Sequence, residues 1–249
     1  MINNSFVIVS CHYNSSKFFK TCYNSCISQD DDDLGIIFID DCSIDSERKA
    51  FLECFTDLKK VGRNYFTAKA HGKDILVLLN DKRVTSAALN QYLAIKHFVT
   101  NPDALCGIVD ADDYLFQNAT KIVREEIGDN WMFCSNNRKK SVIPDFKKNI
   151  RKQPWKIQHF RGWKKKLSDL VRLHSFFRND KVIGPGSDLP YIYPMMEMAG
   201  PDRIKHIEKE LYYYNNKNPI NDFNVNLSEQ CKTKRLERSV DPYDRIDVL

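Results

Sequence analysis

Three carboxylates follow a short apolar run in the stretch CGIVDADDYLFQ, residues 106–117. The run CGIV has the apolar character of a buried strand, and Asp110, Asp112 and Asp113 come directly after it. Like charges this close raise one another's pKa, so we expect basic side chains or a divalent cation beside them. A single Asp would suffice to cap the next helix, a role that Asp113 could fill. Three carboxylates therefore favour a metal site at a strand end.

The elements that would position these acids alternate along the first half of the chain. Strands are predicted at 5–11, 34–40, 74–80, 105–110 and 131–135, and helices at 17–29, 46–58, 85–99 (with Thr85 as N-cap) and 118–127. Such alternation predicts an α/β fold with a mostly parallel central sheet flanked by helices. The chain has 249 residues, 42% of them hydrophobic, so we expect one large domain with a sizeable core.

Polar residues collect at the ends of the predicted strands. SCHYN (10–14) follows the first strand, DDCSIDS (40–46) the second, NDKR (80–83) the third and DADD (110–113) the fourth. Ligands of parallel sheets bind beyond the carboxyl ends of the strands. We therefore expect one ligand site along this edge, where Arg83 could supply positive charge for phosphates.

The second half of the chain is less regular and strongly basic. Between Arg138 and Lys181 there are 15 Lys and Arg but only three acidic residues. This stretch indicates either an anionic partner, such as a phosphate-bearing substrate or a membrane surface, or a solvated basic loop. The chain shows no helix-turn-helix, zinc-finger or RNA-binding signature, so specific nucleic-acid binding is not expected. Residues 159–177 are predicted to form a helix, and the polar tail from Asn215 to follow the surface.

Cysteine usage and hydropathy indicate the compartment. Of eight cysteines, Cys22 and Cys26 have helical spacing with no matching second pair, which makes a zinc knuckle improbable. Mostly buried, reduced thiols are typical of the cytosol. We find neither a signal-peptide pattern nor an apolar run of about 20 residues. We therefore expect a cytoplasmic protein, either free or at the cytosolic face of a membrane.

Several of these segments together resemble family 2 glycosyltransferases of the GT-A fold. In chain order, the segments are VIVSCHYN, IIFIDDCSIDS, NDKRVTSAALNQ, IVDADDYL, HFRGWKKKL, GSDLPYIYPMMEMAG and ELYYYNNKNPINDF. The chain departs from the family pattern at Cys11-His12, where Pro-Thr is more usual, and at Cys42 and Thr85, which replace glycines. The resemblance implies a single GT-A domain over 1–249. Its donor-binding half would be 1–115, its acceptor-binding half 116–215 and its tail 216–249.

The resemblance also implies an activity and donor-binding residues. The enzyme would be an inverting, metal-dependent glycosyltransferase that moves a sugar from a nucleoside-diphosphate donor to a glycan, lipid-linked or protein acceptor. The residues implied for the nucleotide-sugar are His12, Tyr13, Asn14, Asp40, Asp41, Arg83, Asn90, Asp110, Ala111 and Asp112. Asp112, assisted by Asp110, would bind Mn²⁺ or Mg²⁺, which prefer oxygen ligands. A late histidine, His206 or His174, could complete the metal site.

Inversion requires a base that takes the proton of the acceptor hydroxyl. Asp188 fits the family's position for this residue, and its flanking glycines and prolines let the backbone approach a ligand. An ordinary turn Asp is the alternative. Glu197 is the second candidate, with an acceptor-binding or supporting role as its alternative. His159 and Arg161 would contact the diphosphate or the acceptor, or else form a plain basic helix face.

Three other functions are weighed against this one. A phosphatase of the haloacid dehalogenase type also has Asp-x-Asp after a strand, but Tyr114 and Leu115 fit its motif poorly. A dinucleotide oxidoreductase requires a glycine-rich turn after the first strand, and SCHYNSS contains no glycine. The third is a GT-A domain that has lost activity and binds nucleotides or glycans. Its intact acids argue against that alternative.

Overall fold

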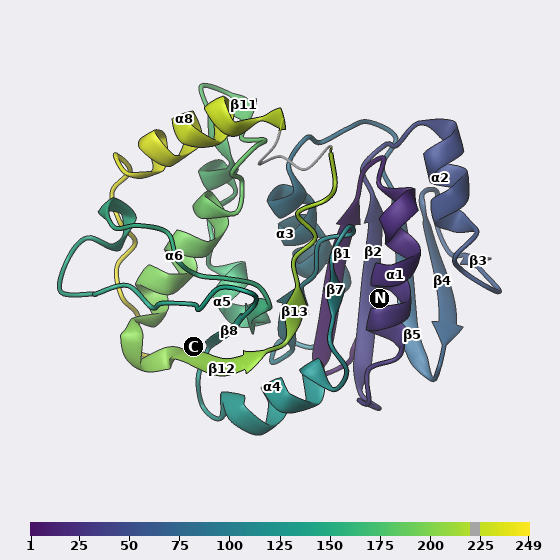
Figure 1. Ribbon diagram of the computed structural model, residues 1–249, viewed down its shortest axis with the longest axis horizontal. Helices are drawn as coiled ribbons and strands as arrows, with labels where there is room; N and C mark the ends of the chain where they lie inside the picture. Colours follow the sequence, from purple (N-terminus) through teal and green to yellow (C-terminus); the bar gives the residue numbers. More distant parts are fainter. Residues whose placement is uncertain (220–224) are drawn as a thin grey trace.

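Strand β1 (Phe6–His12) lies at the centre of the fold, between two parallel neighbours. It pairs with β2 (Leu34–Asp40) on one side and β6 (Leu105–Ile108) on the other, and β2 pairs in parallel with β5 (Lys73–Leu79). The computed structural model, which describes residues 1–219 and 225–249, extends this core to a nine-stranded sheet (Figure 1). The mostly parallel sheet confirms the predicted α/β class.

The outer strands of the large sheet include antiparallel pairs. The sheet order is β12-β8-β9-β6-β1-β2-β5-β4-β3. The remaining strands of this sheet are β3 (Lys59–Lys60), β4 (Tyr65–Ala70), β8 (Met132–Asn136), β9 (Arg161–Lys164) and β12 (Ile204–Glu210). Two small sheets pair β7 (Tyr114–Leu115) with β13 (Tyr212–Tyr213), and β10 (Phe177–Arg178) with β11 (Lys181–Val182).

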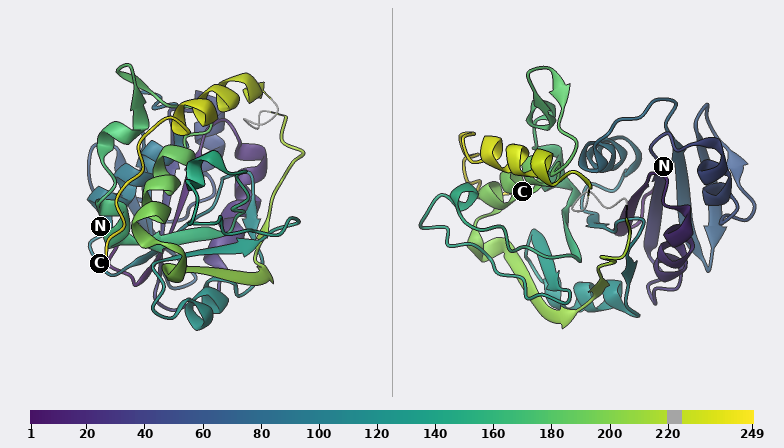
Figure 2. Two further views of the ribbon diagram at one scale, coloured as in Figure 1. Left: turned by 90° about the vertical axis from the view of Figure 1, so that its left-hand side faces the viewer. Right: turned by 45° about the horizontal axis from the view of Figure 1, so that its top comes forward.

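Helices cover both faces of the sheet, as Figures 1 and 2 show. One face packs against α1 (Ser16–Ile27), α2 (Asp45–Leu52) and α4 (Ala119–Ile127), and the other against α3 (Ala87–Phe98), α5 (Lys165–Asp169) and α6 (Leu189–Ala199). Helix α8 (Leu227–Glu237) lies on α6. Short 3₁₀ turns are η1 (Ile150–Lys152), η2 (Leu173–Phe176) and η3 (Pro201–Arg203). Successive side chains of a strand point to opposite faces, so Val7 and Val9 join one core and Phe6 and Ile8 the other.

The structure corrects two expectations and adds two elements that were not predicted. Residues 159–177 do not form one helix, because β9 is inserted between β6 and β8, followed by α5 and η2. A Cβ at Gly162 would lie 2.2 Å from the Cys106 carbonyl oxygen, so glycine allows this strand to pack. The tail contains helix α8, and the β3–β4 hairpin was not predicted. Ser86, not Thr85, caps α3, since its Oγ accepts a hydrogen bond from Leu89 N.

No helix among the described residues is both long and apolar enough to cross a lipid bilayer. All eight cysteines are free thiols.

Candidate active site

The polar strand ends meet at one edge of the sheet, as expected from the sequence. In the parallel register, His12 pairs with Asp40 and Asp40 pairs with Leu79, so the loops that follow β1, β2 and β5 start side by side. Val109 N bonds to Val9 O, which brings the DADD stretch to the same edge. The structure therefore gathers the predicted donor-binding loops.

His12 and Asp40 form an enclosed pair within this edge. His12 Nδ1 lies 3.0 Å from Asp40 Oδ1, and both residues are 0% exposed. Ser15 N donates to His12 Nε2, so Nδ1 carries the proton and donates to Asp40. The imidazole also stacks on Phe51, with ring centroids 4.9 Å apart. The predicted donor contact of the His12 side chain is thus replaced by a supporting role beneath the surface.

Asp40 is held ionised although it is buried. Burial alone would raise its pKa, but hydrogen bonds from His12, Ser43 and Arg48 outweigh burial and lower the pKa. Arg48 Nε lies 2.7 Å from Asp40 Oδ2 and also reaches the Asn80 carbonyl. All of these groups enclose the carboxylate, so the predicted nucleoside contact of Asp40 is indirect in this structure.

Asp41 shapes the loop that follows β5. Its carboxylate accepts hydrogen bonds from Asn80 Nδ2 at 2.8 Å, Val84 N at 2.8 Å and Thr85 N at 3.1 Å. Asn80 Nδ2 also donates to Asn90 Oδ1 at 2.9 Å. Asp41 and Asn90 are both buried. These two predicted donor residues therefore fix the conformation of the loop instead of lying open to a ligand.

Tyr13 and Arg83 are the more accessible members of the predicted set. The Arg83 guanidinium carbon lies 3.5 Å from the centroid of the Tyr13 ring, a cation–π contact between the loops after β1 and β5. Asn14 has φ 46° and joins the loops after β1 and β2, since its N donates to Ser43 Oγ and its Oδ1 accepts from Ile44 N. An exposed cation thus sits on an aromatic ring beside the acidic strand ends.

Asp113 is buried and does not cap the next helix. Its oxygens accept hydrogen bonds from Tyr212 OH at 2.6 Å and Asn215 N at 2.7 Å. Burial, together with Asp110 and Asp112, raises the pKa of Asp113 to about 8. Helix α4 has Asn118 as its N-cap. Tyr212 and Asn215 were not among the predicted site residues, although both lie in ELYYYNNKNPINDF, one of the segments that resemble the family.

Asp110 and Asp112 border this buried acid and are partly exposed. Asn218 Nδ2 donates to Asp112 Oδ2 at 2.7 Å, and Asp110 N bonds to Tyr212 OH. Burial first, and the nearby Asp110 and Asp112 carboxylates second, raise the pKa of Asp113; a divalent cation would offset the charge of those two neighbours. Ala111 is buried, so only its backbone could reach a ligand.

Asp110 and Asp112 fit Mg²⁺ or Mn²⁺ as metal ligands only if the substrate supplies further oxygen ligands. Mg²⁺ is commonly held by one or two carboxylates together with substrate phosphates and water. Among residues 1–219 and 225–249, no group of three or more His, Cys, Asp or Glu side chains forms a metal cluster. His206, which bonds to Asn136 on the outer part of the sheet, and His174 in η2 therefore do not complete such a group.

Strand β9 links the acidic edge to Asp188. Arg161 Nη2 lies 3.1 Å from Asp188 Oδ2, and two residues earlier His159 Nδ1 lies 3.8 Å from Asp110 Oδ2. Burial, then the nearby Arg161 charge, lowers the pKa of His159 well below its usual value, so this imidazole is neutral near pH 7. The Asp188 side chain is 37% exposed at the start of α6. The two predicted acids, Asp110 and Asp188, therefore contact residues that are two positions apart in one short segment.

Glu197 is engaged in a buried ion pair. Arg151 binds it through Nε at 2.6 Å and Nη2 at 2.8 Å, and Tyr243 N donates to it at 3.0 Å. Arg151 also binds Glu237 of α8 at 3.0 Å, which in turn pairs with Arg178. Glu197 thus fits the supporting role and not that of a base. Arg151 and Glu237 were missed, because sequence spacing does not reveal such distant pairs.

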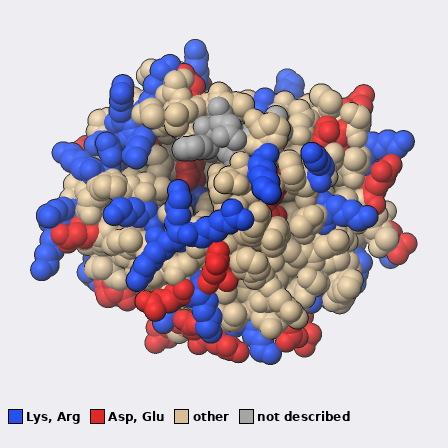
Figure 3. Space-filling view, in the orientation of Figure 1, with Lys and Arg blue, Asp and Glu red and all other residues tan. Residues whose placement is uncertain are grey.

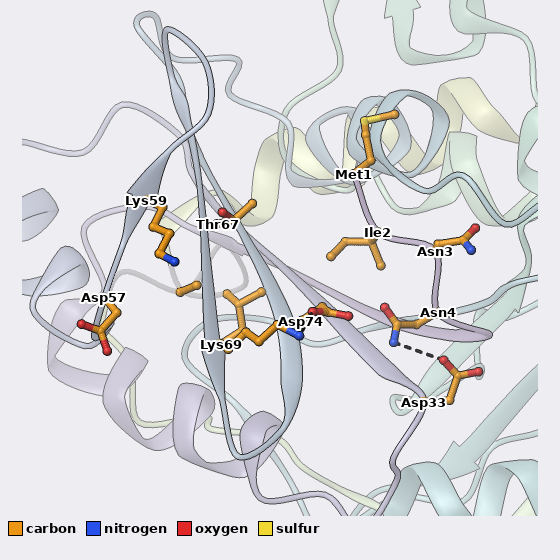
Figure 4. A pocket seen from close by; sticks show the side chains of 12 residues that line it. Met1, Ile2, Asn3, Asn4, Asp33, Asp57, Lys59, Thr67, Lys69 and Asp74 are labelled. Carbon is orange, nitrogen blue, oxygen red and sulfur yellow. Dashed lines mark hydrogen bonds and ion pairs between the residues drawn. The ribbon is translucent and has the colours of Figure 1, made fainter.

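A cavity of about 910 Å³ lies at the opposite edge of the sheet (Figure 4). Residues 1–4, Asp33 and Asp74 line it near the amino-terminal ends of the parallel strands, together with Lys59 and Lys69 from the hairpin. Asn4 Nδ2 donates to Asp33 across one side. Lys69 pairs with Asp74, so the charges that line the cavity are partly neutralised. This hollow is separate from the acidic edge.

The comparisons with known proteins agree with this geometry. The family model described as Glycosyl transferase family 2 matches residues 7–182. No curated protein sequence matches the chain significantly.

Solved structures share the fold at low sequence identity. The S. aureus TarS 1–349 structure is 15% identical, with a TM-score of 0.56 over 94% of this chain and 65% of that one. The mannosyltransferase PcManGT from Pyrobaculum calidifontis, in complex with GDP-Man and Mn²⁺, is 11% identical (TM-score 0.58; 96% and 66% covered). M. tuberculosis glucosyl-3-phosphoglycerate synthase is 11% identical (TM-score 0.54; 94% and 80% covered). The sheet and its helices therefore have the GT-A architecture.

Proposed function

This chain belongs to glycosyl transferase family 2, and we propose that it is an inverting, metal-dependent enzyme that uses a nucleotide-sugar donor. The observation that carries the proposal is that Asp110 lies beside His159 and Asp188 beside Arg161, two residues later in the same segment, with Asp112 two positions after Asp110 in the chain. Complexes of the fold neighbours with UDP-GlcNAc, or with GDP-Man and Mn²⁺, support a donor of this class. We assign donor binding to residues 1–115, acceptor binding to 116–215 and the tail to 216–249.

The donor diphosphate is expected at the acidic edge. Asp112 and Asp110 would hold Mn²⁺ or Mg²⁺ jointly with the phosphate oxygens, which supplies the oxygen ligands that the protein lacks. Such a cation stabilises the negative charge that develops on a departing diphosphate. Arg83 on the Tyr13 ring offers a second positive charge at this edge. Asp41 and Asn90 contribute by holding the loop that carries Arg83.

Asp188 is the proposed base. Arg161 fixes one carboxylate oxygen, and the side chain remains partly open to solvent. The acceptor hydroxyl gives its proton to Asp188 while its oxygen bonds to the anomeric carbon. The bond from that carbon to the diphosphate breaks with its electron pair on the leaving group. Attack opposite to the leaving group inverts the anomeric centre.

Two further parts of the proposal concern the cellular setting. Eight free thiols support a cytoplasmic location, where thiols stay reduced. Lys and Arg gather over the left part of the face in Figure 3, where the basic stretch 138–181 and α8 lie in Figure 1. This positively charged surface supports the proposal that the partner is negatively charged, either an acceptor molecule or a membrane surface. The acceptor hydroxyl itself belongs to a glycan, a lipid-linked sugar or a protein.

The test is nucleoside-diphosphate release from a panel of nucleotide-sugars with Mn²⁺ or Mg²⁺. Asp188→Asn is expected to lower kcat by about 10²–10⁴-fold and to leave the donor KM nearly unchanged. Asp180→Asn is the matched control, because Asp180 is exposed in the β10–β11 turn. Full turnover in Asp188→Asn would place the base elsewhere. Nucleotide binding without any turnover in the unmodified protein would favour the inactive binding domain.

A further inference from the structure

A cavity of about 310 Å³ is lined in part by Asp188. Its main lining side chains are Trp155, Asp188, Leu189, Leu227, Gln230 and Lys234. The volume lies at the lower end of the range for small-molecule pockets, about 300–1,000 Å³. Apolar and aromatic walls with a few polar groups are typical of such pockets. The cavity thus has the size and the lining for a compact polar molecule next to the proposed base.

Helix α8 forms one wall and is fixed by buried contacts. Thr233 Oγ1 donates to the Pro185 carbonyl at 2.8 Å, and one turn later Glu237 pairs with the buried Arg151. Gln230 and Lys234 are four residues apart, so they lie on one face of the helix, which borders the cavity. Both residues lie beyond the part of the chain that the family model matches. The cavity wall formed by α8 is therefore held in place by specific contacts and lies outside the part of the chain that matches the family.

The cavity lining carries one acidic and one basic side chain, which differ in their pairing. Asp188 is its acidic residue, and that carboxylate is already paired with Arg161. Lys234 forms no ion pair with any residue of the described ranges, whereas Lys232, half a turn away, pairs with Glu229. Arg238, one turn beyond Lys234, adds a charge near Tyr193. A ligand that carries a negative group is therefore favoured over a neutral one.

Trp155 supplies an aromatic part of the cavity lining. Its ring meets Tyr193 edge to face, at 5.3 Å between centroids and 80° between planes. Arg161 lies 5.9 Å from the Trp155 ring centroid. Tyr193 is buried, so it holds the indole in place. A fixed indole offers a flat apolar surface on which the apolar face of a sugar ring can pack.

We propose that this cavity is the acceptor subsite and that it selects a saccharide bearing a phosphate or carboxylate group. Lys234 binds the anionic group, Trp155 packs against the sugar ring, and the reactive hydroxyl faces Asp188. Gln230 provides a hydrogen-bonding amide beside Lys234. The inference rests on the proposed transfer reaction, since it names the acceptor class for the same base.

The test compares matched saccharides by titration calorimetry at low salt. Methyl glycosides of glucose, galactose and N-acetylglucosamine are measured beside their 6-phosphates and, for the first two, their uronic acids. Each titration uses the protein with Mn²⁺ and the nucleoside diphosphate that stabilises it most. The anionic member of at least one set is expected to bind about five- to tenfold more tightly than the neutral member. About 0.5 M salt should remove most of that difference.

Variants assign the preference to its residues. Lys234→Met should abolish the anionic preference and keep neutral binding, while Lys232→Met, the matched control, should keep the preference. Trp155→Ala should weaken neutral and anionic members alike, with melting temperatures confirming that each variant is folded. Whether the 6-phosphates or the uronic acids bind more tightly than the neutral glycosides shows whether the cavity prefers a phosphate or a carboxylate. A preference that survives in Lys234→Met overturns the proposal.

The two proposals fail in different ways. If nucleotides bind with metal but no saccharide of the panel binds, the acceptor inference is overturned and the donor assignment stands. If neither nucleotides nor saccharides bind, the proposed function itself is contradicted.

Discussion

The two halves of the molecule hold their charged side chains in different ways. In the proposed donor half (1–115), carboxylates accept hydrogen bonds from loops that start side by side in the sheet, as Asp41 does from Asn80 and Val84. In the proposed acceptor half (116–215), Arg151 is only 1% exposed and joins Glu197 of α6 to Glu237 of the tail helix α8. Strand register thus positions one half, and long-range ion pairs position the other.

This difference has a consequence for stability. A register of parallel strands is supported by many hydrogen bonds, so one lost side chain disturbs it little. A buried ion pair concentrates its support in a few groups, and removal of one partner leaves an uncompensated charge in the interior. The acceptor half is therefore expected to be the more sensitive to single substitutions.

The largest effect is expected from Arg151→Met. The substitution leaves Glu197 and Glu237 buried without their shared cation, and it should reduce the free energy of unfolding by about 3–5 kcal/mol. Urea unfolding followed by circular dichroism measures the change. Arg172→Met is the control, because Arg172 is exposed and its guanidinium lies over the Tyr243 ring, with no ion pair to any described residue. Equal, small losses in both variants would remove the contrast between the halves.

A smaller effect is expected from Asp40→Asn in the donor half. The substitution removes charge-assisted hydrogen bonds with Arg48 and His12 and should cost about 1.5–3 kcal/mol at pH 7. The folded-state pKa of Asp40 lies below its unfolded value, so this contribution is complete above the unfolded pKa. It is lost as the pH falls through the folded-state pKa.

The pH dependence of that loss is measured by urea titrations in neutral and acidic buffers. The stability difference between the natural chain and Asp40→Asn should shrink in acid. A difference that stays constant down to the lowest pH at which both proteins fold would show that Asp40 is not held ionised.

The smallest effect is expected from Arg83→Met at the mouth of the donor half. Arg83 lies on the exposed part of the edge and stacks on Tyr13, so its loss should raise the donor KM about two- to fivefold. The melting temperature should not change. Lys82→Met, at the neighbouring exposed position, is the control. An equal rise of KM in both variants would mean that Arg83 acts only through the net positive charge of this edge and makes no specific contact with the donor.

The sequence predicted the first half of the fold well, because its strands and helices have clear apolar patterns. The strand predicted at 34–40 has the same bounds as β2, and the helix predicted at 118–127 differs from α4 by one residue. The prediction of one helix over 159–177 was wrong, because the basic residues and apolar spacing of this segment resemble those of an amphipathic helix. Their strand conformation depends on β6 and β8, which lie on either side of it.

The sequence predicted where the polar residues of the candidate site lie better than it predicted what each of them does. His12, Asp40 and Asp41 lie at the expected edge, but burial turns them into supports for the loops and for each other. Burial of a polar side chain cannot be inferred from a motif alone. Tyr212 and Asn215 lie about a hundred positions from Asp113, and only folding brings them together.

Nucleotide binding shows whether Asp110 and Asp112, with a divalent cation, bind a nucleotide-sugar at the carboxyl edge of the sheet. Thermal unfolding is measured with UDP, GDP and their sugar derivatives in Mn²⁺, Mg²⁺ or EDTA, for the natural chain and for Asp112→Asn. Ligand binding to the folded state raises the melting temperature by mass action. We expect a rise for one nucleoside diphosphate that vanishes in EDTA and in Asp112→Asn. No rise with any nucleotide, or one that persists in both, would contradict it.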